Sequence, residues 1–339
     1  YVGHPLWIKS DESPDAGILR SCPHRYPSIM PTIGQALTVE HLSKRFGKVH
    51  AVQDLSFSVE PGRVTGFLGP NGSGKTTTLR CMLGLVRPSG GAARIGGHVY
   101  RDLNHPGRIV GAALEASGFH PGRSARDHLR VISDALGLPK TRADEVLELV
   151  GLTDAAGRKA GGFSLGMRQR LSLAAALVGD PGILILDEPA NGLDPEGIAW
   201  LRGLLRGLAR EGKTVLVSSH VLSEVQQTVD DVVIISRGAL VQSGTLADLA
   251  GNGAVRVRVR TPRREALVAA LEASGGSNPP TGLDPIGPDE LLVTGITPSD
   301  IGRTAFLAGV ELHELVQQTN DLESLFLELT ATGTPGGTA

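Results

Sequence analysis

The chain has 339 residues, and at ~150 residues per domain this length predicts about two domains. Its 33 Lys and Arg against 35 Asp and Glu give a formal net charge of −2. This balance argues against general electrostatic binding of nucleic acid, so no specific nucleic-acid partner is expected. Two cysteines, Cys22 and Cys81, exclude a disulfide framework and fit a reducing compartment. The apolar runs are all shorter than the roughly 18 residues of a membrane span, so the sequence predicts no transmembrane helix.

The first 34 residues are predicted to be a disordered N-terminal extension. Residues 1–29 contain four prolines and no hydrophobic periodicity. Met30 directly precedes the first regular pattern, so we interpret it as the start of the native chain, which leaves open whether residues 1–29 are native.

Residues 35–250 are predicted to form one α/β domain, because short apolar runs alternate with helical patterns. The run 183–186 is apolar throughout, as in a parallel strand buried on both faces. A helix is predicted over 195–210, with Asp194 as N-cap and Pro195 as the first helical residue. The predicted strands are Leu37–Leu42, Leu55–Val59, Val64–Leu68, Ile183–Leu186, Thr214–Ser218 and Val232–Ile235.

A small α+β domain is predicted over 251–331, followed by a disordered tail over 332–339. Its first strand, 254–260, alternates valine with arginine, and we favour a solvated face for Arg256, Arg258 and Arg260 over a site for anionic lipid or nucleic acid. The remaining predicted elements are a helix over 263–273, a loop over 275–288, strands Leu291–Val293 and Glu311–Val316, a helix Pro298–Leu307 after Thr297, and a last helix with Leu322, Leu325, Phe326 and Leu329 on one face.

A phosphate-binding loop follows the predicted strand 64–68. The sequence reads Gly69-Pro70-Asn71-Gly72-Ser73-Gly74-Lys75-Thr76-Thr77, which fits G-x-x-x-x-G-K-[ST] at every fixed position, and a helix is predicted over Thr77–Leu85. The glycines let backbone N–H groups wrap the phosphates, and the helix N-terminus adds partial positive charge. We expect Lys75 to reach the β- and γ-phosphates and Thr76 to ligate Mg²⁺.

A second nucleotide motif ends the apolar strand, as Ile183-Leu184-Ile185-Leu186-Asp187-Glu188. Two carboxylates after such a strand are the Walker B arrangement. Asp187 is expected to help hold Mg²⁺, partly through water, and Glu188 to polarise the attacking water as general base.

The residues between these two motifs indicate which family of nucleotide-hydrolysing proteins the chain resembles. Phe163-Ser164-Leu165-Gly166-Met167 resembles the Leu-Ser-Gly-Gly-Gln signature of the ATP-binding cassette (ABC) family; Phe163, Leu165 and Met167 depart from it. In that family the signature binds the γ-phosphate held by the opposite subunit, so the resemblance implies that Ser164, Leu165, Gly166 and Met167 act in trans.

Other family elements match by position. Asn191-Gly192-Leu193-Asp194 is similar to the D-loop, and Ser218-Ser219-His220 to the switch whose His220 contacts the γ-phosphate. Phe46 stands where the family has an adenine-stacking tyrosine; the alternative for Phe46 is an ordinary core position. Glu115 follows a strand expected at 109–114 and occupies the family's Q-loop glutamine position, with a solvated loop acid as the alternative. An acidic residue there is typical of the ABC-2 type bacterial branch that serves drug and antibiotic exporters.

The resemblance implies a P-loop fold with a parallel core sheet, an antiparallel β-subdomain and a helical subdomain. It implies an ATPase that uses ATP and Mg²⁺, closes as a dimer, expected to be a homodimer, and drives a separate polytopic membrane permease through the insert 116–161. The chain would then lie in the cytoplasm, peripheral on the inner face of the membrane. Two other classes stay open: a soluble ABC ATPase acting on ribosomes or DNA, and a nucleotide-sensing regulator with poor turnover.

Overall fold

The computed structural model describes residues 34–114, 118–221, 225–251, 255–273 and 280–318. Several predictions fall outside these residues: the N-terminal extension up to residue 33, Glu115, the last amphipathic helix and the C-terminal tail. The predicted domain boundary at residue 250 falls in the last turn of a described helix.

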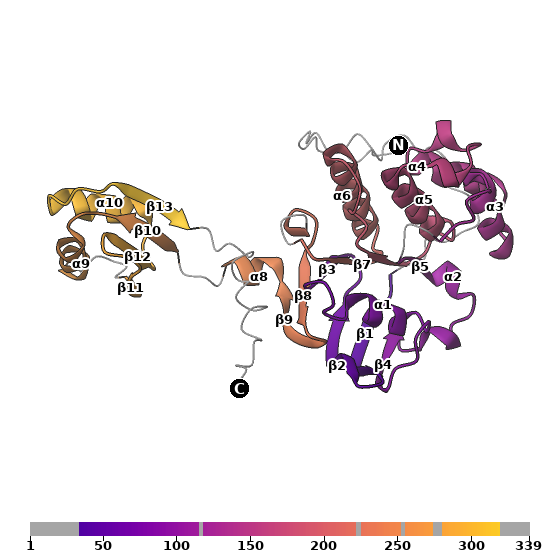
Figure 1. The fold of residues 1–339 in the computed structure, drawn as a ribbon, viewed down its shortest axis with the longest axis horizontal. Helices are drawn as coiled ribbons and strands as arrows, with labels where there is room; N and C mark the ends of the chain where they lie inside the picture. The colour runs from indigo at the N-terminus through magenta and orange to yellow at the C-terminus, as the bar shows by residue number, and fades with distance from the viewer. Residues whose placement is uncertain (1–33, 115–117, 222–224, 252–254, 274–279, 319–339) are drawn as a thin grey trace, which may run out of the picture.

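The elements follow in a fixed order along the chain (Figure 1). The strands are β1 (Leu37–Phe46), β2 (Val49–Val59), β3 (Val64–Leu68), β4 (Gly90–Ile95), β5 (Val110–Ala113), β6 (Ile183–Asp187), β7 (Thr214–Ser219), β8 (Asp231–Ser236), β9 (Ala239–Thr245), β10 (Arg256–Arg260), β11 (Gly282–Pro285), β12 (Glu290–Thr294) and β13 (Glu314–Gln318). The helices are α1 (Lys75–Met82), α2 (Pro106–Ile109), α3 (Ala125–Ala135), α4 (Thr141–Leu149), α5 (Leu165–Leu177), α6 (Pro195–Arg210), α8 (Leu246–Gly251), α9 (Arg264–Ala273) and α10 (Pro298–Leu307).

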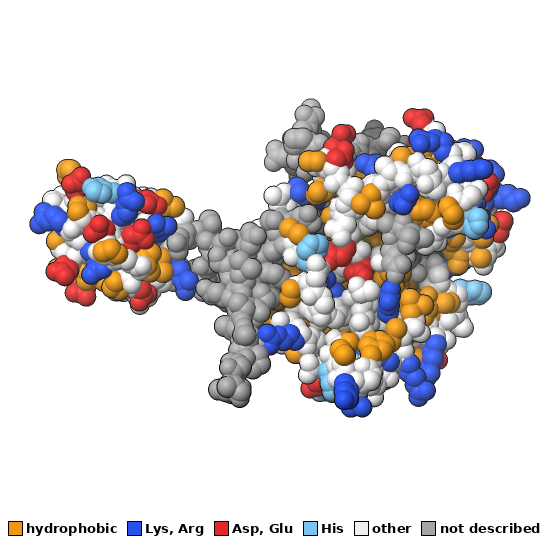
Figure 2. All heavy atoms as spheres, viewed as in Figure 1, with side chains coloured by type: hydrophobic (Ala, Val, Ile, Leu, Met, Phe, Trp, Pro, Cys, Tyr) orange, Lys and Arg blue, Asp and Glu red, His pale blue; other side chains and the backbone are white. Residues whose placement is uncertain are grey.

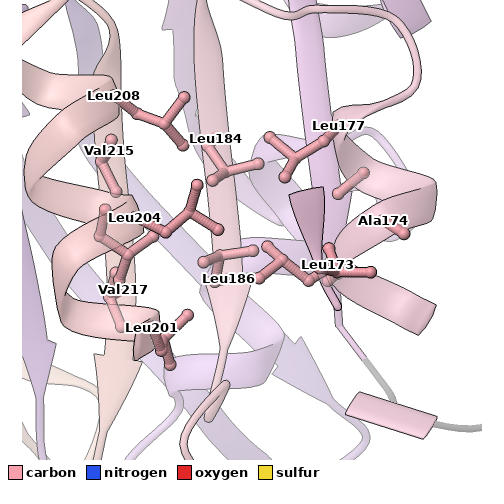
Figure 3. Packing of buried hydrophobic residues seen from close by; sticks show 14 of the residues in the cluster. Leu173, Ala174, Leu177, Leu184, Leu186, Leu201, Leu204, Leu208, Val215 and Val217 are labelled. Carbon is pink, nitrogen blue, oxygen red and sulfur yellow. The ribbon is translucent and has the colours of Figure 1, made fainter. Parts of the chain in front are cut away.

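The central sheet has the order β5-β6-β7-β3-β8-β9 and is parallel except for the antiparallel edge pair β8–β9. Its inner strands bury apolar side chains on both faces, which explains why β6 contains no polar residue before Asp187. On one face Leu184 and Leu186 of β6 pack between helices α5 and α6 (Figure 3). On the other face Ile183 and Ile185 join a second core cluster.

That second cluster lies between the central sheet and a three-stranded antiparallel sheet of order β2-β1-β4. Helix α1 is sandwiched there, with Leu79 and Met82 buried (Figure 1). Helices α3 and α4 pack with α5 into a helical layer, and Ser124 caps the start of α3 by accepting a hydrogen bond from the Asp127 N–H. The parallel core, the antiparallel β-subdomain and the helical subdomain expected from the sequence are therefore all present.

The C-terminal unit has its own sheet and its own core. The chain order is β10-α9-β11-β12-α10-β13, and the antiparallel sheet has the order β11-β12-β10-β13, which is the βαββαβ topology of ferredoxin-like folds. Val257, Val259, Leu291 and Val293 are fully buried against α9 and α10. Thr297 caps α10 as predicted.

Some boundaries predicted from the sequence are wrong. The loop predicted over 275–288 contains strand β11, and the strand predicted from Glu311 begins at Glu314. The helix after the phosphate loop begins at Lys75 rather than Thr77 and ends at Met82. Strands β4 and β9 had no sequence prediction. In the described part of the chain, no helix is both long and apolar enough to cross a membrane.

Candidate nucleotide-binding site

The loop between β3 and α1 bends sharply at two glycines. Gly72 has φ +78° and Gly74 has φ +102°, both in the region that side chains disfavour. A Cβ on Gly74 would lie 2.4 Å from the carbonyl oxygen of Ala51, so the loop also needs the missing side chain for space. Helix α1 begins at the next residue, and its free N–H groups therefore face the loop.

Lys75 is held inside this loop. It is only 6% exposed, and its Nζ donates hydrogen bonds to the carbonyl oxygens of Gly69 at 2.6 Å and Pro70 at 3.3 Å. The same Nζ lies 3.4 Å from Glu188 Oε1. The hydroxyl of Ser73 is buried and, within the described residues, has no hydrogen-bond partner. An ammonium, an orphan hydroxyl and a helix N-terminus thus meet in a cradle that suits a phosphate.

The parallel register places the first carboxylate beside the loop. Asp187 pairs with Ser218 in the sheet, and the Thr76 hydroxyl donates to Asp187 Oδ2 at 2.6 Å. The Ser218 hydroxyl donates to Asp187 Oδ1 at 2.5 Å. The hydroxyl of Thr76 and the carboxylate of Asp187 thus lie together, and both offer the hard oxygen ligands that Mg²⁺ prefers.

Glu188 has an unusual backbone, with φ +50°. Three groups hold it: its N–H donates to Ser218 Oγ at 3.0 Å, its carbonyl accepts from Gln169 Nε2 at 3.3 Å, and the same carbonyl accepts from the Asn191 N–H at 3.2 Å. The carboxylate then lies 2.8 Å from the Nδ1 of His220. The structure therefore brings together Lys75, Thr76, Asp187, Glu188 and His220, all named from the sequence.

Two further residues were not identified as site residues from the sequence. Ser218 and Gln169 contact the backbone or carboxylates of the Walker B pair, yet each contact joins elements far apart in the chain. Ser218 does carry a sequence signal, because it ends a buried strand next to the switch histidine. Gln169 carries a weaker one, a polar side chain that is 9% exposed on a helix of apolar residues.

The signature residues meet the D-loop of their own chain. Ser164 is exposed and caps α5 by accepting a hydrogen bond from the Met167 N–H at 3.3 Å. A Cβ on Gly166 would lie 3.0 Å from the Gly192 carbonyl, and Leu165, which is 56% exposed, also adjoins Gly192.

The other D-loop and signature side chains are placed as follows. Asp194 is exposed and caps α6 by accepting a hydrogen bond from the Gly197 N–H at 2.8 Å. Met167 is partly buried against the main core. The described contacts of Ser164 and Asp194 are thus helix caps, and their expected role across a dimer stays a prediction.

Phe46 lies at the end of β1 and is 49% exposed, so the core alternative is wrong for this ring. The Lys44 ammonium lies 4.7 Å from the ring centroid. An exposed ring beside a cation is open to stack on a planar ligand. Cys81, by contrast, is buried in the core, and burial raises the pKa of its thiol.

Comparison with known proteins places the chain in a family. Residues 52–191 match the sequence model described as ABC transporter. A bacitracin transport ATP-binding protein of Bacillus licheniformis is 45% identical over 204 residues, which are 59% of this chain and 67% of that protein. The chain belongs to the ABC transporter family. A lantibiotic transport ATP-binding protein of Streptococcus pyogenes is 36% identical over 207 residues, 60% of this chain and 89% of that protein.

A solved ATP-binding subunit of an ABC transporter shares the fold with a TM-score of 0.58 and 29% identity, covering 63% of this chain and 91% of that one. This ABC protein is therefore the ATP-binding and ATP-hydrolysing subunit of a transporter, and the ribosome- or DNA-directed alternative is not favoured. Residues 255–323 match a family described only as a domain of unknown function.

The two glycines of the loop give a matched pair of variants. Gly74→Ala should abolish or severely weaken ATP binding, because its Cβ collides with the Ala51 backbone. Gly72→Ala should weaken ATP binding much less, because Gly72 has a positive φ but a Cβ there would meet nothing within 4 Å. Titration with a fluorescent ATP analogue measures both affinities, and equal losses would contradict the steric argument.

Proposed function

We propose that this ABC ATPase powers the export of antibiotic-like molecules through a separate polytopic membrane permease. The single observation that supports catalysis most directly is that the Glu188 carboxylate contacts both Lys75 and His220 beside the phosphate loop. The substrate class is supported by the relatives named for bacitracin and lantibiotic transport.

In this proposal the loop from Gly69 to Thr77 binds the phosphates, and Lys75 neutralises the β- and γ-phosphates. Phe46 stacks on the adenine, which its exposure permits. Thr76 and Asp187 hold Mg²⁺, whose role when bound is to neutralise charge on the phosphate oxygens. Glu115 is assigned to the same region by its place in the sequence.

Glu188 acts as the general base in the proposed reaction. One carboxylate oxygen lies near Lys75 and the other near His220, so both oxygens are oriented by neighbours. A carboxylate fixed in this way is suited to take a proton from a water molecule. Ser218 and Gln169 are positioning residues, because they hold the backbone of Glu188 rather than the reacting atoms.

We further propose that the active unit is a homodimer. Ser164, Leu165, Gly166 and Met167 would then reach the ATP of the opposite subunit, and Asp194 would lie at the dimer contact. The exposure of Ser164, Leu165 and Asp194 supports this, since all three are free to meet a second chain. The ATPase domain spans residues 35–250 and a separate small domain spans 251–331, an assignment supported by the independent core of the C-terminal unit.

The permease would bring the ATPase to the cytoplasmic face of the membrane. The helical insert, which includes α3 and α4, is the proposed coupling element. Affinity purification of the chain from gently solubilised native membranes tests the partner. We expect a polytopic membrane protein in stoichiometric amount; recovery of ribosomes or DNA-bound proteins without one would contradict the export proposal.

Glu188→Gln should lower ATP turnover by about 10²-fold or more, because the amide cannot accept the proton from water. ATP binding should persist, because the loop and Lys75 are unchanged, and the ATP-bound dimer should accumulate. Steady-state phosphate release and sedimentation with ATP measure the two effects. Turnover close to that of the parent chain would remove Glu188 from the base role.

Ser218→Ala removes the hydroxyl that joins Glu188 and Asp187, so kcat should fall by about tenfold to a hundredfold while the KM for ATP changes little. Ser219→Ala is the matched control, because the Ser219 hydroxyl bonds only to Val221 in the described structure. A similar small effect from both variants would show that Ser218 does not position the base.

A further inference from the structure

The small C-terminal sheet has one face on which neither of its two described helices packs. Helices α9 and α10 pack on the face that carries Val257 and Val259, so by alternation the neighbouring residues point to the other side. The open face, as we define it, consists of Arg256, Arg258 and Arg260 on β10, Glu290, Leu292 and Thr294 on β12, Asp284 on β11, and Glu314 and Val316 on β13.

The charges on the open face balance, with the arginines on one strand and the acids spread over the other three. Three arginines occupy β10, and three acids, Asp284, Glu290 and Glu314, occupy the strands around it. Arg258 Nη2 already contacts Glu290 Oε1 at 2.7 Å. Acidic and basic side chains are also interspersed over the side of this unit seen in Figure 2. A nucleic acid or an anionic membrane would meet acids as often as bases, so neither fits this face.

The strand register gives the open face one ion pair that two-fold symmetry would form twice between two copies. Arg260 is opposite Glu290, and Arg258 is opposite Leu292, across the line where β10 meets β12. This line runs through the middle of the sheet, because the order is β11-β12-β10-β13. A two-fold axis parallel to that line, lying between the two open faces, sets β10 of one copy over β12 of a second copy, with Arg260 facing Glu290 and Arg258 facing Leu292.

We propose that the open face binds the open face of a second copy of this chain, within the ATP-driven dimer. This inference rests on the proposed function, which supplies the dimer. Val316, which is 49% exposed, and the partly exposed Leu292 add apolar area on either side of Arg258.

The area of the open face limits how strongly two copies can bind through it. Four strands spaced ~4.8 Å apart and about five residues long cover roughly 300 Å² in each copy. A stable free-standing interface buries roughly 1,200–2,000 Å² in total, so this contact is too small to hold two separate chains. It gains strength from being tethered to a domain that dimerises, which gives the two faces a high effective concentration. The contact therefore adds to the ATP-bound dimer rather than creating it.

Two charge reversals test this contact in the full-length chain carrying Glu188→Gln, with ATP present. Arg260→Glu and Glu290→Arg should each weaken the dimer about tenfold, because like charges then face each other at both symmetry-related positions. Mixing the two variants should restore the parental affinity. One contact of the mixed dimer then pairs the two introduced residues, which have opposite charges, and the other contact pairs the unchanged Arg260 of one chain with the unchanged Glu290 of the other. Differently tagged chains and sedimentation velocity measure the dissociation constants.

The mixing step separates a contact between copies from one within a chain. Glu290→Arg also breaks the internal pair with Arg258, and a loss of that origin would persist in the mixture. Arg303→Glu and Glu272→Arg are matched controls, since both residues are exposed on the helical side of the same unit, and they should leave the dimer unchanged.

Other outcomes would overturn the inference. An ATP-bound dimer that forms with parental affinity in both single variants would show that the open face contacts no second copy, while leaving the proposed ATPase dimer intact. Weakened binding to phosphatidylserine vesicles or to RNA, with no change in the dimer, would assign the face to another partner. Failure of the parent chain to dimerise with ATP would instead contradict the proposed function.

Discussion

Strand β7 pairs in parallel with both β3 and β6, and this pairing fixes where the phosphate loop, the two carboxylates and the switch histidine lie. The register sets Leu68 beside Ser219 and Asp187 beside Ser218, so the phosphate loop, the carboxylates and the switch histidine all leave the sheet at one edge. A slip of β6 by one residue would turn Asp187 to the opposite face of the sheet, away from Thr76 and Ser218. The chemistry of the site thus depends on the strand register behind it.

At this edge the backbone of Glu188 turns into a conformation that non-glycine residues seldom adopt. A residue keeps such a backbone conformation only where several surrounding contacts hold it. Here the N–H is tied to β7 through Ser218, and the carbonyl is tied to α5 through Gln169 and to the following loop through Asn191. Helix α5 also begins at the signature motif. The same rigid helix therefore connects the exposed signature residues with the backbone of the proposed base.

Much of this arrangement was predictable from the sequence, and the exceptions have physical reasons. The phosphate loop and β6 were found because a fixed glycine spacing and an unbroken apolar run are strong local signals. Strand β4 was missed because Gly90, Gly91 and two alanines have little strand preference, and β11 was missed because it lies among glycine and proline. The contacts of Ser218 and Gln169 with Glu188 join three separate elements, so no local pattern contains them. Nothing about a glutamate in sequence indicates a positive φ.

The position of Lys75 has a consequence for the order of events at the site. Its ammonium group neutralises one oxygen of Glu188 and is also the group that the phosphate loop offers to an anion. A phosphate arriving in the loop competes with the carboxylate for that single positive charge. In the described structure the ammonium lies 3.4 Å from Glu188 Oε1, while Oε2 lies 2.8 Å from His220 Nδ1. Phosphate binding in the loop would therefore change the partner of Lys75 and leave His220 beside the Glu188 carboxylate.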